Sequence, residues 1–353
     1  MSIILFFVAL AILVLSHELG HFLAAKKSGI KVEEFGFGFP PRLFGVKRGE
    51  TVYSLNLIPF GGFVKIFGED SDKNLPRSFS SKSIPVRAIV LFAGVLFNVI
   101  LAWILLSAVF FVGAPSSVGD SAQGKVTILE VQQNTPAEKA GLMSGDQILR
   151  VSFKDEILDA KTVAETQLFI KNHRGLPIKI DYLRGKEQKS AEATPDVNPE
   201  TGKGALGIAM DKIGIVSIPI HKAVYEGLKT TLVLIQTIAE SLSALVVSLV
   251  KGAGVSANVA GPVGIIGIVG TASEFGFVYV VQLVALLSIN LAIINFMPFP
   301  ALDGGRLLFL AIEAVRRKPI SQKVFKAINS IGFFILIGLM LLITYRDIIK
   351  LIK

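Results

Sequence analysis

The chain has 353 residues, no cysteine and a formal net charge of +9, and 52% of its residues are hydrophobic. A mean hydropathy of +0.62 is too high for an ordinary soluble protein of this length, so membrane-spanning helices are expected. The lack of cysteine excludes disulfides, thiolate zinc ligands and a cysteine nucleophile.

Four stretches are long and apolar enough to cross a bilayer as helices, which takes about 20 apolar residues each. The first contains a His-Glu-His cluster, and the other three carry no charge. No basic n-region and no small-residue cleavage site precede the cluster, so we expect a retained helix rather than a signal peptide. The stretches are residues 3–25, 88–119, 275–302 and 327–345.

Basic residues concentrate in two of the connecting segments. Residues 24–87 carry 11 Lys and Arg against 6 Asp and Glu, and residues 304–327 carry 6 against 1. The long segment 112–275 carries 16 against 17. Four spans place both basic segments on one side, which the positive-inside rule assigns to the cytoplasm. The positive charge therefore indicates membrane topology rather than nucleic-acid binding.

Residues 33–70 combine short alternating runs with Pro-Pro, Arg-Gly and Pro-Phe-Gly-Gly breaks. This pattern predicts small β-hairpins rather than helices. Two interpretations remain open. One is a β-ribbon on the surface; the other is a β-element that enters the membrane, where protein or a water-filled cavity would cover its irregular backbone.

Residues 122–211 have the mixed composition of a soluble domain. Pro136 opens a short helix, and a second helix fits residues 161–172. Two strands fit on either side of the turn at Arg184 and Gly185.

Residues 225–250 predict a helix with one apolar stripe whose members recur at steps of three and four. Such a helix is either a fifth span or an amphipathic helix that lies in the membrane interface. The stripe comprises Leu228, Leu232, Ile235, Ala239, Leu242, Val246 and Leu249.

The motif HELGH lies inside the first apolar stretch. Its two histidines are four residues apart, so they differ by roughly 40° around a helix and share one face. This spacing lets His17 and His21 bind one Zn²⁺ while Glu18 reaches a neighbouring water molecule. The alternative is a polar patch that lines a proton or ion pathway. We expect His173 and His221, which lie in polar surroundings, to be ordinary surface residues.

Zinc needs a third protein ligand and an open position. Without cysteine, and with the other histidines outside the spans, this ligand is expected to be a carboxylate within the membrane. Asp303 ends the third apolar stretch, where Pro298 and Pro300 break the helix and Gly304-Gly305 let the backbone turn sharply. The alternative is an Asp-Gly turn with no metal.

The membrane topology tests whether Asp303 can share a metal ion with His17 and His21. His17 lies about 21 Å along a helix that begins at Ile3, near the cytoplasmic end of its span. The third of four spans brings Asp303 to the same depth. A fifth span at residues 225–250 would move Asp303 to the opposite side. The chemistry therefore favours four spans and an interfacial helix at residues 225–250.

Together these motifs resemble the site-2 protease family of intramembrane zinc metalloproteases, specifically its bacterial RseP-like branch. The resemblance covers essentially the whole chain. It rests on HELGH at residues 17–21, on NFMPFPALDG at residues 295–304, and on a PDZ-like module between the second and third spans. It implies His17, His21 and Asp303 as zinc ligands, Glu18 as the catalytic base, and Asn295 as a residue near the substrate or the oxyanion.

The resemblance also implies that residues 33–70 re-enter the membrane and that PFGGFVK (59–65) contacts the substrate. An exposed strand edge there would hold an extended substrate by β-augmentation. The chain departs from the better-known form with two tandem PDZ domains, because residues 122–211 suffice for one. The expected substrate-binding residues are Gly61, Gly62, Phe63 and Val64.

The predicted fold is a polytopic α-helical membrane protein with four transmembrane helices, a membrane-re-entrant β-region and an inserted PDZ-like α+β domain. Its segments are residues 1–27 (transmembrane helix 1 with HExxH), 28–85 (membrane-associated β-region), 86–113 (transmembrane helix 2), 114–212 (extracytoplasmic PDZ-like domain), 213–259 (amphipathic interfacial helix region), 260–305 (transmembrane helix 3 with the LDG motif) and 306–353 (cytoplasmic loop and transmembrane helix 4).

The implied activity is zinc-dependent cleavage of transmembrane segments of single-pass membrane proteins, such as an anti-sigma factor or remnant signal peptides. The protein is expected to be a monomer in the inner membrane of a bacterial cell, with its site near the cytoplasmic side. The alternative is a non-catalytic PDZ-bearing membrane scaffold or a metal transporter, which leaves Glu18 between the two histidines unexplained. Asn98, in the second span, is either an interhelical hydrogen-bonding residue or part of the site.

Overall fold

A computed structural model gives the fold of the chain. It describes residues 2–69, 75–119, 123–185, 187–196, 205–251, 261–318 and 320–352. Within it the chain forms two compact units. The first comprises Met1–Ala108, Val224–Gly270 and Val281–Lys353, and the second comprises Val109–Ala223 and Thr271–Val280.

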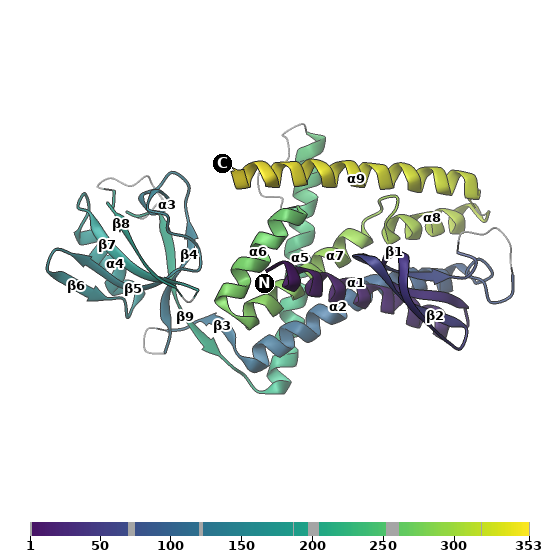
Figure 1. Cartoon of the computed structure of the whole chain (residues 1–353), viewed down its shortest axis with the longest axis horizontal. Coiled ribbons are helices and arrows are strands. Elements are labelled where there is room, and N and C mark those ends of the chain that lie inside the picture. Colours follow the sequence, from purple (N-terminus) through teal and green to yellow (C-terminus); the bar gives the residue numbers. More distant parts are fainter. Residues whose placement is uncertain are drawn as a thin grey trace. The chain divides into compact units, whose positions relative to one another are not determined.

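Four of the described helices are long and apolar enough to cross a membrane, as the sequence predicts. Their apolar windows contain at most two charged residues each, and helices satisfy their backbone hydrogen bonds internally, as a bilayer requires. They are α1 (Ser2–Lys27), α2 (Ile84–Val112), α7 (Phe277–Phe296) and α9 (Gln322–Ile352) (Figure 1).

The segment expected as one third span, residues 260–305, consists of several elements. A short apolar helix, α6 (Pro262–Phe275), ends before Gly276, whose φ of +123° favours glycine. Helix α7 follows and ends at Phe296, ahead of the two prolines. Asp303 does not close α7 but opens a further helix, α8 (Asp303–Arg316).

Helix α5 (Ile220–Val250) is one continuous helix, as the sequence predicts, and packs against α2 and α7. Of the predicted apolar stripe, Leu228 and Leu232 are exposed, whereas Ile235 packs into the cluster. The residues that face α2 and α7 are Gly227, Leu234, Ile235 and Ile238, and Ala223 and Thr231 are buried on the same side.

Strands β1 (Val32–Arg48) and β2 (Thr51–Ile66) form an antiparallel ribbon that packs against α1 (Figure 1). Both strands fold back, so residues 34–37 pair with residues 52–55 on one side, and residues 32–37 pair with residues 62–66 on the other. Residues 42–48 then pair with the outer side of 51–56. Within this ribbon, residues 62–66 therefore form an edge with pairing on one side only.

Close helix contact positions the first two helices. A Cβ on Gly20 would lie 2.2 Å from the backbone oxygen of Ala93, so only glycine allows α1 and α2 to approach this closely. Below this contact, Ala25, Ile30, Val90 and Leu310 form part of a buried cluster that joins α1, α2 and α8. The helix that carries HELGH is thus fixed against α2.

The second unit contains the inserted domain, with strands β3 (Ala114–Ser117), β4 (Lys125–Val131), β5 (Gln147–Phe153), β6 (Glu156–Asp159), β7 (Ile178–Arg184), β8 (Glu187–Ala193) and β9 (Ile208–Val216). The strand order is β3-β9-β4-β5-β7-β8, with β6 paired to β5. Helices α3 (Pro136–Lys139) and α4 (Val163–Asn172) lie where the sequence predicts helices. One apolar cluster, which includes Val126, Ile148, Phe169 and Ile180, forms the core.

His173 is not an ordinary surface residue, so that prediction was wrong. Its side chain is buried at the C-terminal end of α4, where its ring stacks on Phe169 with centroids 4.3 Å apart. Its Nδ1 lies 2.9 Å from the carbonyl oxygen of Phe169. His221 is exposed, as expected.

Candidate metal centre

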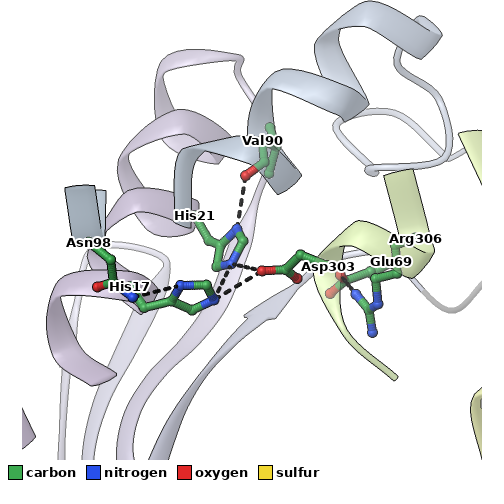
Figure 2. Close-up of polar contacts among 7 residues, drawn as sticks. All are labelled: His17, His21, Glu69, Val90, Asn98, Asp303 and Arg306. Carbon is green, nitrogen blue, oxygen red and sulfur yellow. Dashed lines mark hydrogen bonds and ion pairs between the residues drawn. The ribbon is translucent and has the colours of Figure 1, made fainter. Parts of the chain in front are cut away.

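His17 and His21 lie one turn apart on α1 and point the same way (Figure 2). Their Nε2 atoms are 3.1 Å apart, and their rings meet edge to face with centroids 4.7 Å apart. Both side chains are buried. The four-residue spacing has therefore placed two imidazole nitrogens at one point, as the helical geometry requires.

Asp303 reaches the same point from a turn between α7 and α8. The turn begins after Phe296, and Ala301 within it has a φ of +73°. Gly304 and Gly305 are required directly after Asp303, because a Cβ on either would lie 2.2 Å from a backbone oxygen of the preceding turn. The LDGG sequence thus combines a carboxylate with the two positions where the backbone comes closest.

The three ligand atoms have the spacing of a zinc site. Oδ2 of Asp303 lies 3.0 Å from Nε2 of His17 and 3.2 Å from Nε2 of His21 (Figure 2). A tetrahedral ion with bonds of about 2.0–2.1 Å requires ligand atoms about 3.3 Å apart. This Oδ2 is buried and accepts no hydrogen bond. The donor set of two imidazoles and one carboxylate is that of catalytic zinc sites, which leave one position open.

A backbone carbonyl orients His21. Its Nδ1 lies 2.9 Å from the carbonyl oxygen of Val90 on α2. That oxygen can only accept, so Nδ1 carries the proton and Nε2 presents its lone pair to the metal position.

Asn98 on α2 has the corresponding place behind His17, so it belongs to the site. Its Nδ2 lies 3.4 Å from Nδ1 of His17, and its Oδ1 is buried without a hydrogen-bond partner. When Nε2 binds a metal, Nδ1 carries the proton and needs an acceptor. A half-turn of the carboxamide satisfies both groups by placing Oδ1 against Nδ1. The backbone oxygen of Asn98 also accepts from Ser288 Oγ on α7, so Asn98 has an interhelical role as well.

Gly94 provides the space for both rings, and sequence reasoning missed it. A Cβ at this position would lie 2.3 Å from Nε2 of His21 and 2.8 Å from Cε1 of His17. The stretch "AGVLFN" contains Gly94 and Asn98 four residues apart, so they share one face of α2. That spacing is the signal that could have identified the wall behind the histidines.

The three ligands and Glu18 line one pocket of about 210 Å³. Phe63 and Val64 of β2 form another side of it, so the structure brings two of the four expected substrate-binding residues to the metal position. Gly62 lies beside Glu18, because a Cβ on it would be 3.3 Å from Cγ of Glu18. Gly61 instead packs on the ring of Phe39.

Asn295 lies in the last turn of α7 and is half-buried. It is not among the residues that line the pocket of the metal centre. Its role near the substrate therefore stays a prediction.

An ion pair that the sequence did not suggest borders the pocket. Arg306, one turn after Asp303 on α8, pairs with Glu69 at the end of the β-ribbon (Figure 2). Both residues line the pocket. The pair joins the β-ribbon to the helix that begins with the third ligand.

Comparison with known proteins gives consistent matches over the whole chain. Residues 5–339 match peptidase family M50. A Clostridium perfringens protein whose name places it among the zinc metalloproteases is 37% identical over 350 residues, which cover 99% of each chain. The zinc metalloprotease RasP of Geobacillus kaustophilus is 30% identical over 430 residues, which cover 99% of this chain and 98% of that protein.

One solved structure with a partial match is the PDZ domain of the SdrC-like protein of Listeria monocytogenes. It is 22% identical, with a TM-score of 0.22, and the match covers 25% of this chain and 90% of that domain.

Proposed function

Because the chain belongs to peptidase family M50 and is a zinc metalloprotease of the site-2 protease type, we propose that it cuts single-pass membrane proteins within their transmembrane segments. The observation that carries this proposal is the position of the metal centre. Two of its ligands lie on α1, a helix long and apolar enough to cross a membrane, and the third follows α7, another such helix. A substrate that reaches this centre is expected to be a membrane segment itself.

Each residue of the site has a separate role in the proposed hydrolysis. Zn²⁺ held by His17, His21 and Asp303 would lower the pKa of a water molecule toward about 7 and polarise the scissile carbonyl. Glu18 faces the same pocket, where its carboxylate accepts a proton from water as general base and later donates it to the departing amine. Asn295 would donate a hydrogen bond from its amide to the developing oxyanion.

Residues 62–66 are proposed to hold the substrate in extended form. A transmembrane helix has every carbonyl hydrogen-bonded, so it must unwind locally before hydrolysis. The edge formed by residues 62–66 carries Phe63 and Val64 into the metal pocket and has unpaired backbone groups on its outer side. Such an edge binds an extended chain through main-chain hydrogen bonds.

Proline substitutions along residues 62–66 test this edge, because successive N–H groups of a strand point to opposite neighbours. Proline at positions whose N–H faces outward is expected to abolish cleavage and leave metal binding intact. Proline at the alternate positions breaks pairing with β1 and serves as the comparison. Unchanged cleavage in all of these variants would remove the edge from the mechanism.

The membrane arrangement is part of the proposal. The exposed apolar residues of the ribbon, among them Phe39, Phe44 and Leu57, support its entry into the bilayer. The positive-inside rule supports a cytoplasmic side for the metal centre and an external side for the inserted domain. The proposed location is the inner membrane of a bacterial cell, and the proposed substrates include anti-sigma factors and remnant signal peptides.

The decisive variant is Glu18→Gln, which removes the proton acceptor and keeps the shape of the side chain. Cleavage of transmembrane substrates is expected to fall to background while Zn²⁺ still binds. A proteomic comparison of membrane fractions that contain the active protein or Glu18→Gln would identify the accumulating substrates. Metal-dependent flux that survives in Glu18→Gln, without any accumulating membrane protein, would favour a metal transporter instead.

A further inference from the structure

The turn that brings Asp303 to the metal centre is held from outside by α9. Oδ1 of Asn329 on α9 accepts a hydrogen bond from the backbone N–H of Ala301, over 3.1 Å. Ala301 precedes Asp303 by two residues and itself lines the metal pocket. A residue 26 positions later in the sequence than Asp303 therefore contacts the backbone that places this ligand.

Ala301 needs this support because of its conformation. Its φ of +73° lies in the left-handed region, which alanine adopts only when its surroundings enforce it. Local bonds in the turn fix its flanks: Phe299 donates to Met297, and Leu302 donates to Phe299. The bond from Ala301 to Asn329 is the described contact that fixes the left-handed residue itself.

A second contact of α9 acts on the same turn. A Cβ on Gly332 would lie 2.5 Å from Cβ of Pro300 and 2.6 Å from its carbonyl oxygen. Gly332 is buried and lies one turn from Asn329, so both residues use the same face of α9. Most of α9 is exposed, with only 6% of its apolar window buried. Among the described residues of α9, few besides Gly332 are buried.

We propose that Asn329 is a positioning residue for the metal centre: by holding Ala301 in its left-handed conformation, it sets the position of the Asp303 carboxylate. Asn329 touches neither the metal position nor the pocket. The inference rests on the zinc site of the proposed function, and it concerns metal binding before it concerns cleavage. Docking of α9 thus completes a site whose ligands all lie on other elements.

The experiment measures metal binding by the full-length apo-protein with Co²⁺, whose absorption reports both occupancy and coordination geometry. Asn329→Ala is expected to weaken Co²⁺ binding about 10-fold or more, as loss of a residue that supports a metal ligand does, and to alter the spectrum. Asn329→Asp, which keeps the accepting oxygen, is expected to bind like wild type. The control is Ile331→Ala on the same helix, whose side chain is 63% exposed.

The combination of Asn329→Ala with Ala301→Gly separates positioning from folding. Glycine adopts a positive φ readily, so the double variant is expected to recover most of the lost Co²⁺ affinity. Merely structural damage to α9 would not be rescued at residue 301. In cleavage assays, Asn329→Ala should lower kcat and leave KM unchanged, since Asn329 does not reach the substrate.

Wild-type Co²⁺ affinity and spectrum in Asn329→Ala would overturn the inference, as would failure of Ala301→Gly to restore binding. If Asn329→Ala does not fold, Asn329→Ser, which is too short to reach Ala301 but remains polar, is measured in its place with the same expectations. Two other results would contradict the proposed function rather than the inference about Asn329. In the first, the wild-type protein binds no metal; in the second, Glu18→Gln still cleaves substrates.

Discussion

At the scale of single residues, the side chains behind the two histidines decide how well the rings bind a metal. Val90 orients His21 through a backbone oxygen, which substitution of the side chain does not remove. Asn98 orients His17 through its carboxamide, which substitution does remove. Gly94 contributes by the absence of a side chain. Asn98 and Gly94 are therefore the positions behind the rings where mutation can report on the metal centre.

Asn98→Ala is expected to lower zinc affinity about 10- to 100-fold, because the acceptor that fixes the tautomer of His17 is lost. Competition with a chromogenic chelator measures the change. Ser288→Ala is the matched control, since it removes the interhelical hydrogen bond to the Asn98 backbone and leaves the carboxamide in place. Equal affinities in the two variants would assign Asn98 to helix packing alone.

Gly94→Ala is expected to abolish stoichiometric zinc binding, because the added methyl group would overlap both imidazole rings. Gly338→Ala is the control, since Gly338 lies in the apolar helix α9 with no atom within 4 Å of an added Cβ. Metal analysis of the purified variants measures the difference. A full complement of zinc in Gly94→Ala would show that α2 moves away from the histidines at little cost.

At the scale of elements, small residues mark where the helices meet. Gly20 meets Ala93, Gly227 meets Ser107, and Gly332 meets Pro300, each at a distance that excludes a Cβ. In a lipid environment large apolar side chains gain little from facing another helix, and close backbone packing decides the contact. On α5 the close contact is made by Gly227, whereas Leu228 and Leu232 of the apolar stripe are exposed.

Parts of the fold and of the metal centre were predictable from the sequence. HELGH, the LDG turn and the four apolar helices have local signatures, so their existence was predictable from spacing and length. The contacts of Asn98 with His17 and of Asn329 with Ala301 join residues 81 and 28 positions apart. No local pattern encodes such pairs, since they depend on how whole helices pack.

The turn between β1 and β2 is tied by Glu50 to the end of α1 and to the segment that follows β2. Its Oε1 accepts hydrogen bonds from Arg77 and Lys26, both over 2.8 Å, and these bonds lower the pKa of Glu50 to about 2. Since the folded-state pKa lies below the ordinary value of 4.5, the carboxylate stabilises the fold above pH 4.5. This contribution is lost as the pH falls from 4.5 toward 2.

Glu50→Gln is therefore expected to lower the melting temperature near pH 7 and to have progressively less effect below pH 4.5. Thermal unfolding of both proteins in detergent across this range measures the difference. The variant Glu187→Gln changes an exposed carboxylate in the other unit and serves as control. A difference that stays constant with pH would mean that charge on Glu50 does not contribute.

At the scale of the whole molecule, the candidate metal centre and the inserted domain belong to different compact units. Every ligand of the candidate metal centre belongs to the first unit, and the strands from β3 to β9 belong to the second. The two ends of the domain pair with each other, Ala114 with Val216 and Ser117 with Ile213. A short linker can therefore replace residues 114–216 without stretching the chain.

Removal of residues 114–216 is expected to leave zinc binding unchanged and to allow cleavage of substrates with bulky external domains that the full chain spares. Parallel cleavage assays with a trimmed and an untrimmed form of one substrate measure this. Loss of cleavage of both forms would mean instead that the domain recruits substrates, for example by their C-termini. Glu18→Gln in the shortened chain is the control for unrelated proteolysis.

The paired ends of the domain also bear on how such a protein can change over evolutionary time. A module that leaves and re-enters the chain on adjacent antiparallel strands presents the same pair of attachment points whatever lies beyond them. Such a module can be duplicated, shortened or exchanged by one in-frame event, with no compensating change in the helices. Changes in the inserted domain and changes in the metal centre can therefore be selected independently, although one polypeptide encodes both.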